Sequence, residues 1–186
     1  MKRRKFLQAS LIAAPLAANV PISVPDERKN KAFKVSAGEG RYHGHIQIKG
    51  LNRNSLDLKV SGKDTAGDLA IYQSTLMSPK SGPPLHIHFY QDEIFYVLEG
   101  EYLFQVGEEK YELKPGDTIF LPRNVPHTWV QLHDTGKMLV VLQPAGKMEE
   151  FFLKVASLDH EATPGEMAKI IEAHDQKVVG PPLKVD

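Results

Sequence analysis

Residues 82–100 have the sequence GPPLHIHFYQDEIFYVLEG. Alternate side chains of a β-strand lie on the same face, so His86 and His88 point to one side and the apolar residues between and beside them point to the other. After a short turn the chain re-enters a strand at Glu93, whose carboxylate can reach the same space from the neighbouring strand. This stretch therefore predicts two strands that bring two imidazoles and a carboxylate together.

The flanking sequence continues the strand pattern over most of the chain. From residue 42 onward, short runs rich in Val, Ile, Leu, Phe and Tyr are separated by Gly, Pro, Asp and Asn roughly every ten residues. That spacing is typical of an all-β sandwich or barrel. We expect strands at 43–49, 56–60, 69–77, 85–89, 94–98, 101–106, 110–113, 118–121, 127–132 and 138–142.

One α-helix is expected near the C-terminus. Thr163 to Glu166 form a capping-box sequence with Pro164 at the first helical position. Apolar and aromatic side chains then follow at i, i+3, i+4 and i+7, namely Met167, Ile170, Ile171 and His174. We expect this helix to pack on the outside of the barrel, and Gly180-Pro181-Pro182 to end any regular structure after it.

Composition limits the classes of function. The chain has 186 residues, 41% hydrophobic and 25% charged, which predicts one globular domain and excludes a disordered chain or a polytopic membrane protein. Four basic residues lie at positions 2–5, and the rest of the chain has more acidic than basic residues. The absence of a basic stripe argues against nucleic acid as a partner. Because the sequence contains no cysteine, any metal must be held by His, Asp or Glu.

The N-terminal segment has the features of an export signal. Residues 1–18 begin with a basic region and continue into an apolar stretch that is too short to span a bilayer as a permanent helix. The string Arg3-Arg4-Lys5-Phe6-Leu7 resembles the twin-arginine export signal. We expect a signal peptide at 1–18, a barrel with an N-terminal extension at 19–155, and a C-terminal helical extension at 156–186. The mature protein would then be periplasmic without stable membrane insertion, or cytoplasmic if this segment is no signal.

A third histidine completes a predicted metal site. His127 follows Pro122 and Pro126 and opens another strand, so it can join His86, His88 and Glu93. Three imidazoles and one carboxylate leave positions for water or substrate on a divalent transition metal such as Fe, Mn, Ni, Cu or Zn. A second His-x-His sequence, His43 and His45, is interpreted as solvent-exposed, because its face continues into polar residues.

These residues resemble two sequence motifs of the cupin superfamily. The first motif is matched by Gly82, His86, His88, Glu93 and Gly100. The second is matched by Gly116, Pro122 and His127. Asn124 stands where the second motif has Gly, and Asn tolerates the positive φ that this turn requires better than most residues. Gln131 stands where that motif ends in Asn. None of these departures removes a predicted metal ligand.

The resemblance implies a double-stranded β-helix, that is, a jelly-roll barrel, with one C-terminal helix. Within the superfamily, the Gly-Pro-Pro-Leu-His-Ile-His opening and the Asp92-Glu93 pair are most similar to single-domain bacterial cupins that resemble quercetin dioxygenases. This likeness implies a metal-dependent oxidoreductase, a dioxygenase acting on a small aromatic or enol-type molecule. Glu93 would be a metal ligand or the base that removes the substrate proton.

Other functions remain open at this point. One alternative is a non-catalytic, metal-containing module that binds a sugar or a small acid, and another is an isomerase or decarboxylase that does not need O₂. If the strand from His127 runs straight, Trp129 and Gln131 share its face and line the substrate pocket, although core packing is the alternative for Trp129. Because cupins commonly pair their sheets, the resemblance also implies a homodimer.

Overall fold

The computed structural model describes residues 28–48, 54–80 and 82–185. The expected signal peptide at 1–18 and the residues that follow it up to position 27 lie outside the described residues. Statements about the structure below concern the described residues.

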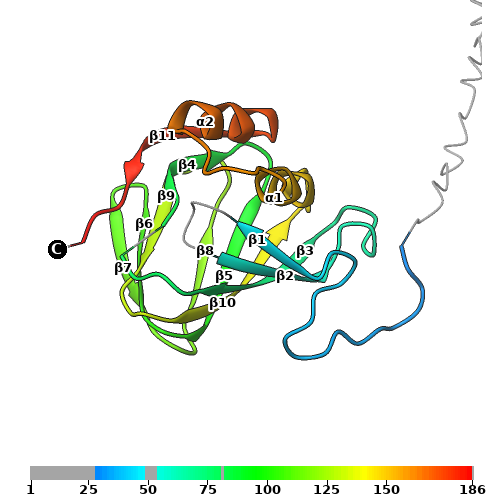
Figure 1. The fold of residues 1–186 in the computed structure, drawn as a ribbon. Helices are drawn as coiled ribbons and strands as arrows, with labels where there is room; N and C mark the ends of the chain where they lie inside the picture. The colour runs from blue at the N-terminus through cyan, green and yellow to red at the C-terminus, as the bar shows by residue number, and fades with distance from the viewer. Residues whose placement is uncertain (1–27, 49–53, 81, 186) are drawn as a thin grey trace, which may run out of the picture.

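Two antiparallel sheets face each other across the core (Figure 1). The first sheet has six strands in the order β1 (His45–Ile48), β2 (Asn54–Val60), β3 (Ala70–Leu76), β10 (Gly136–Gln143), β5 (Asp92–Glu99) and β8 (Thr118–Leu121). The second has five strands in the order β11 (Gln176–Pro182), β4 (Pro84–His88), β9 (His127–Gln131), β6 (Tyr102–Val106) and β7 (Glu109–Leu113). This architecture is a jelly roll.

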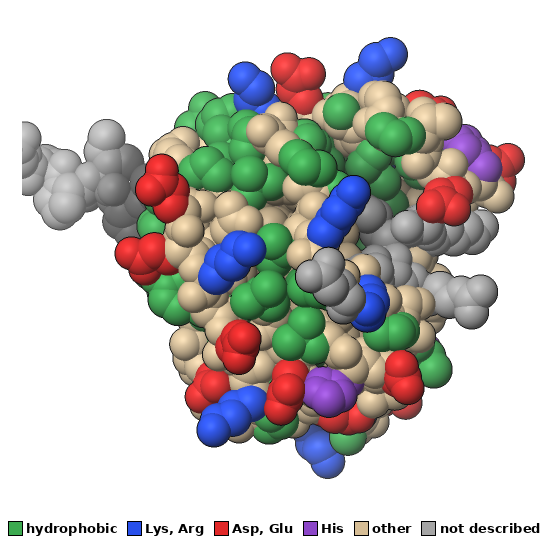
Figure 2. All heavy atoms as spheres, turned by 90° about the vertical axis from the view of Figure 1, so that its left-hand side faces the viewer, with side chains coloured by type: hydrophobic (Ala, Val, Ile, Leu, Met, Phe, Trp, Pro, Cys, Tyr) green, Lys and Arg blue, Asp and Glu red, His purple; other side chains and the backbone are tan. Residues whose placement is uncertain are grey.

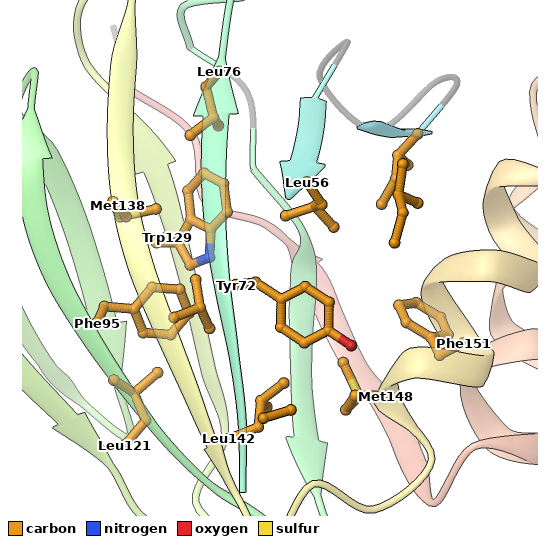
Figure 3. Close-up of a cluster of buried hydrophobic side chains, with 14 of the residues drawn as sticks. Leu56, Tyr72, Leu76, Phe95, Leu121, Trp129, Met138, Leu142, Met148 and Phe151 are labelled. Atoms are coloured by element: carbon orange, nitrogen blue, oxygen red, sulfur yellow. The ribbon is translucent and has the colours of Figure 1, made fainter. Parts of the chain in front are cut away.

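The strand prediction is confirmed for β1 to β10, whose ends differ from the expected ranges by at most two residues. The strands could be predicted because apolar and polar residues alternate along them. Along β3 and β10 every second side chain is buried, so the period of two in the sequence corresponds to one face toward the core. Large side chains from both sheets fill the space between them. Phe95 contacts Phe104, and Trp129 contacts Tyr102, both edge to face. Phe95 and Trp129 lie together in the core in Figure 3.

Two helices lie together at one end of the sheets, one against β1 and the other against β11 (Figure 1). The expected helix is confirmed as α2 (Pro164–Ala173), and its capping box is formed by Thr163 and Glu166. The other helix, α1 (Met148–Ala156), was not predicted. Its N-cap position is Lys147, which makes no side-chain cap hydrogen bond, so the usual start signal is missing from the sequence. Two glutamates in its first turn favour the helix through its dipole instead.

The expectation that Gly180-Pro181-Pro182 ends regular structure is wrong, because β11 continues through Pro182. Proline lacks the N–H that a central strand needs, but β11 is the edge strand of its sheet and its pairing with β4 is irregular at these residues. The C-terminal segment therefore contains both a helix and a strand, and the helical layer begins at Met148, inside the range assigned to the barrel.

The surface on the side of β6 and β7 has Lys and Arg side chains spread among Asp and Glu (Figure 2). Neither helix in the described part of the chain has the length and apolar character that a membrane crossing requires.

Candidate metal centre

Strand pairing brings the three predicted histidines together. His86 and His88 are the buried side chains at the end of β4, and His127 is the first residue of β9. The register pairs His86 directly with His127, so their rings lie 4.5 Å apart between centroids. One ring nitrogen from each of the three histidines lies within 4.8 Å of the others. This spacing is compatible with three nitrogen ligands on one ion.

Glu93 reaches the same point, but from a different direction than the sequence suggested. We expected its carboxylate to come from the strand neighbouring the histidines, whereas β5 belongs to the facing sheet. Its Oε1 lies 3.4 Å from Nε2 of His88, and its Oε2 lies 3.5 Å from Nε2 of His127. The site therefore spans the barrel interior, with imidazoles from one sheet and a carboxylate from the other.

Hydrogen bonds at the other ring nitrogens fix how the imidazoles face. Nδ1 of His86 donates to the Pro84 carbonyl at 2.8 Å, and Nδ1 of His127 donates to the Val125 carbonyl at 3.0 Å. Because a carbonyl can only accept, these rings carry their proton on Nδ1 and direct the Nε2 lone pair inward. Among the described residues, Nε2 of His88 and of His127 are buried atoms without a hydrogen-bond partner. A divalent metal would satisfy both, so the donor set fits such an ion.

Gln91 holds the third imidazole, and the sequence analysis missed this role. Its Oε1 lies 3.4 Å from Nδ1 of His88, while its Nε2 donates to the Ala145 carbonyl at 2.8 Å. The side chain is 2% exposed. In the sequence, a glutamine between two strands is typical of a turn, so only the burial of Gln91 in the structure indicates that it orients His88.

The electrostatics of the site favour the protonation states that metal ligands need. Burial, together with the neighbouring His127 and His88, lowers the pKa of His86 to about 3. Burial also lowers the pKa of His88. For Glu93, burial acts to raise the pKa, but the adjacent His88 and His127 outweigh it and hold that pKa at about 2. At neutral pH the site therefore combines neutral imidazoles at 86 and 88 with an ionised carboxylate.

Two backbone features position the segments that carry the ligands. Asn124 adopts φ 64°, as expected for the residue in place of the motif glycine, and its N–H donates to the His88 carbonyl at 2.8 Å. A Cβ added at Gly82 would lie 1.7 Å from the Trp129 carbonyl oxygen, so only glycine permits this close approach of the segment before β4 to β9. Both contacts join the two histidine-bearing strands.

The predicted pocket residues have different positions. Trp129 is 8% exposed, packs against Tyr102 and also lines the cavity beside the histidines. Gln131 is fully buried, but it is not among the side chains that line the cavity. Its amide instead donates to the His133 carbonyl at 2.5 Å.

The second His-x-His sequence does not join the site. His45 is exposed, as expected, and its Nδ1 lies 2.6 Å from Asp57. His43 precedes β1 and is half-buried, which corrects the expectation of full exposure. Its Nε2 lies 2.8 Å from Glu149, which also accepts a hydrogen bond from Ser61 at 2.6 Å. This pair fastens the first turn of α1 to the barrel.

A cavity of about 120 Å³ adjoins the cluster of histidines and Glu93. Strands of both sheets form most of its wall, and the C-terminal segment completes it. Figure 3 shows Met148 and Phe151 of α1 across from Leu56 and Tyr72. Side chains of this segment that line the cavity are Met148, Phe151, Phe152, Val155, Ile171 and Gln176. None of the described residues along the wall is a lysine or an arginine.

Removing one imidazole tests the metal site. His127→Ala is expected to lower the metal affinity, so that the variant retains less metal than the wild type against a competing chelator, because it loses one of the converging donors. Elemental analysis of the reconstituted protein, with circular dichroism to check the fold, measures this. The matched control is His133→Ala, because His133 is exposed and pairs with Glu101 on the surface. Full metal content in the His127 variant would contradict the assignment.

Gln91→Leu tests the support behind the ligands. We expect metal affinity to fall by about ten- to a hundredfold, because the variant loses the oxygen that orients His88. Competition with a chromophoric chelator gives the dissociation constant. Gln73→Leu is the control, since Gln73 lies on the outer face of β3. Equal affinities in the two variants would show that Gln91 has no such role.

Stability of the metal-free protein should depend on pH. The pKa of His86 is about 3 in the folded state and 6.5 as the ordinary value, so the unfolded chain takes up this proton first on acidification. Between pH 6.5 and about 3 the free energy of unfolding is expected to fall, at up to about 1.4 kcal/mol per pH unit for this group. Glu93 adds a decrease in the same direction from pH 4.5 to about 2. Denaturant titrations in EDTA at several pH values measure the free energy of unfolding. If its dependence on pH is unchanged in His86→Gln, His86 is not the cause.

Comparison with known proteins agrees with this geometry. Residues 74–142 match the family model described as Cupin domain. An uncharacterised protein of Methanocaldococcus jannaschii is 49% identical over 43 residues, which are 23% of this chain and 34% of that protein. The quercetin 2,3-dioxygenase of Bacillus subtilis is 36% identical over 92 residues, which are 48% of this chain and 26% of that enzyme. The chain thus spans only about a third and a quarter of these two relatives.

Among solved structures, an RmlC-like cupin from Shewanella frigidimarina superposes with a TM-score of 0.52 at 18% identity. The superposition covers 64% of this chain and 96% of that protein, and at this identity it concerns the fold alone. The matched segment contains His86, His88, Glu93 and His127, the side chains that converge in the barrel. The sequence motifs, the jelly-roll topology and the family match agree, and residues 74–142 of the chain form a cupin domain.

Proposed function

We propose that this protein is a metal-dependent dioxygenase that adds both atoms of O₂ to a small aromatic or enol-type molecule. The observation that carries the proposal is an apolar cavity whose wall includes His86, His88 and Glu93. The local similarity to a quercetin 2,3-dioxygenase supports the same reaction class. Since the chain spans about a quarter of that enzyme, the similarity does not extend to its substrate.

The size of the cavity favours a substrate smaller than a flavonol. Its volume of about 120 Å³ is similar to the roughly 150 Å³ of an apolar cavity that holds one benzene ring. Three fused or linked rings would not fit beside α1 in this conformation. We therefore assign a one-ring phenol or enol, or a short diketone, as the substrate class.

The four converging side chains would hold one divalent transition metal. Such an ion would stabilise the ionised form of a substrate hydroxyl, and Fe, Mn, Ni or Cu would also supply the redox chemistry with O₂. The apolar wall would orient the ring and exclude water from it. No external reductant is needed if both oxygen atoms enter the substrate with cleavage of a carbon–carbon bond, because the substrate then provides all the electrons that reduce O₂.

Glu93 is the residue we assign to proton transfer. Its carboxylate is 5% exposed and ionised at neutral pH, so it can accept the proton of a substrate hydroxyl at the cavity wall. The same oxygens face His88 and His127, so Glu93 is also placed to bind the metal. Glu93→Gln separates these roles, because an amide can still coordinate weakly but cannot accept the proton.

The character of the wall disfavours a sugar or a small acid as the ligand. A sugar carries a hydroxyl on most of its carbons, and each would lose its hydrogen bonds to water in this cavity. A free carboxylate would find no lysine or arginine among the described lining residues. A non-catalytic module for such ligands is therefore a poor match to this site.

Oxygen consumption tests the proposal. Protein loaded separately with Fe²⁺, Mn²⁺, Ni²⁺ or Cu²⁺ is supplied with one-ring phenols, 1,3-diketones and a flavonol, and uptake is followed with an oxygen electrode and ¹⁸O₂. We expect uptake with at least one metal and one small substrate, and both labelled atoms in the product. Glu93→Gln should lower the rate about a hundredfold or more while metal is retained.

His133→Ala is the control and should behave as the wild type. Turnover that continues without O₂ would contradict the dioxygenase and indicate an isomerase or a decarboxylase. Thermal stabilisation by a ligand without any turnover would indicate a binding module.

A further inference from the structure

One polar side chain in the cavity wall has no role in the metal centre and no partner. Ser74 lies on the inner face of β3, where the other side chains are Ala70, Tyr72 and Leu76. Its register partners are Leu56 on β2 and Met138 on β10, so apolar side chains flank the hydroxyl on both sides. Ser74 lines the same cavity as the histidines.

The hydroxyl of Ser74 is buried without a hydrogen bond. The residue is 3% exposed, and its Oγ has no hydrogen-bond partner within the part of the chain that the structure describes. A buried polar atom left unpaired destabilises the folded protein, which apolar residues at this position would avoid. Outside the metal centre, Tyr72, Tyr102 and Gln131 also have unpaired buried oxygens among the described residues, but they do not line the cavity. Gln176 does line it, and its amide contacts the Met148 sulfur at 3.1 Å.

The strand register places Ser74 at a distance from the metal centre. Leu142 pairs with Glu93 on one side and with Ala70 on the other, so Ala70 marks the level of the carboxylate on β3. Ser74 lies four residues further along the strand, about 13 Å at the usual rise per residue. A ligand that contacts both the metal centre and Ser74 must therefore extend along the cavity.

We propose that Ser74 is a specificity-determining residue that donates a hydrogen bond to a neutral oxygen substituent of the substrate. This inference rests on the proposed function and narrows its substrate class. The molecule would carry an ionisable hydroxyl at the end near Glu93 and a carbonyl or similar oxygen at the opposite end of a single ring. The absence of lysine and arginine from the described wall requires that this second group be uncharged.

Two probes of nearly equal shape test the assignment by binding alone. Protein loaded with redox-inert Zn²⁺ is titrated by calorimetry with 4-hydroxyacetophenone and with 4-ethylphenol, which differ by the carbonyl oxygen. We expect the wild type to bind the acetyl compound about tenfold more tightly, and Ser74→Ala to lose this preference without weakening 4-ethylphenol. Without ligand, the variant should unfold at the same or a higher temperature, because an unpaired hydroxyl is removed.

Thr75→Ala is the matched control, since it removes a hydroxyl from the outward-facing neighbour on the same strand. It should keep the preference. Overturning results are an unchanged preference in Ser74→Ala, an equal loss of affinity for both probes, or no binding of either probe to the wild type. A preference that depends on Ser74, found in a protein that consumes no O₂, would support this inference and contradict the dioxygenase.

Discussion

The pairing of His86 with His127 is the contact on which the site depends. It is the register pair between β4 and β9, and it joins two motifs that lie about forty residues apart in the sequence. Because side chains alternate along a strand, a slip of one residue would turn an imidazole out of the barrel. Gly82 and Asn124 protect this register, the first by allowing the strands to approach and the second by its hydrogen bond to the His88 carbonyl.

Burial then gives the assembled side chains their chemical character. His86 is buried in the barrel interior, so its protonation is disfavoured. Carbonyl groups fix the rings of His86 and His127, and Gln91 supports His88. The donor set is thus prepared by the fold before any ion is present. Such preorganisation is costly to build from surface loops, and here rigid strands provide it.

Much of this arrangement could be predicted from the sequence because it depends on local alternation. The strands, the inward direction of His86 and His88, and the positive φ of Asn124 all follow from periods or residue types within a few positions. The sheet to which Glu93 belongs could not be predicted, because sheet membership depends on pairing between distant segments. Helix α1 was missed for lack of a capping residue, although Met148, Phe151, Phe152 and Val155 have helical spacing.

Strand β11 was missed for a related reason. Gly180 and its two prolines are typical of a chain break, and only a free sheet edge makes them acceptable in a strand. The position of Ser74 in the cavity wall is also a property of packing rather than of composition. Unpaired groups of this kind survive in proteins when they contribute to function at the expense of stability.

The C-terminal segment contributes part of the cavity wall without contributing to the histidine cluster. The predicted metal ligands lie inside residues 74–142, whereas α1, α2 and β11 supply six cavity-lining side chains from beyond that stretch. Substitutions in α1, α2 or β11 can change the shape of the cavity without moving the histidine cluster. Proteins that share residues 74–142 with this chain but differ in the C-terminal segment are therefore expected to share the converging donors and to differ in the cavity. Sequence similarity within residues 74–142 is therefore informative about the predicted metal ligands and says little about the substrate.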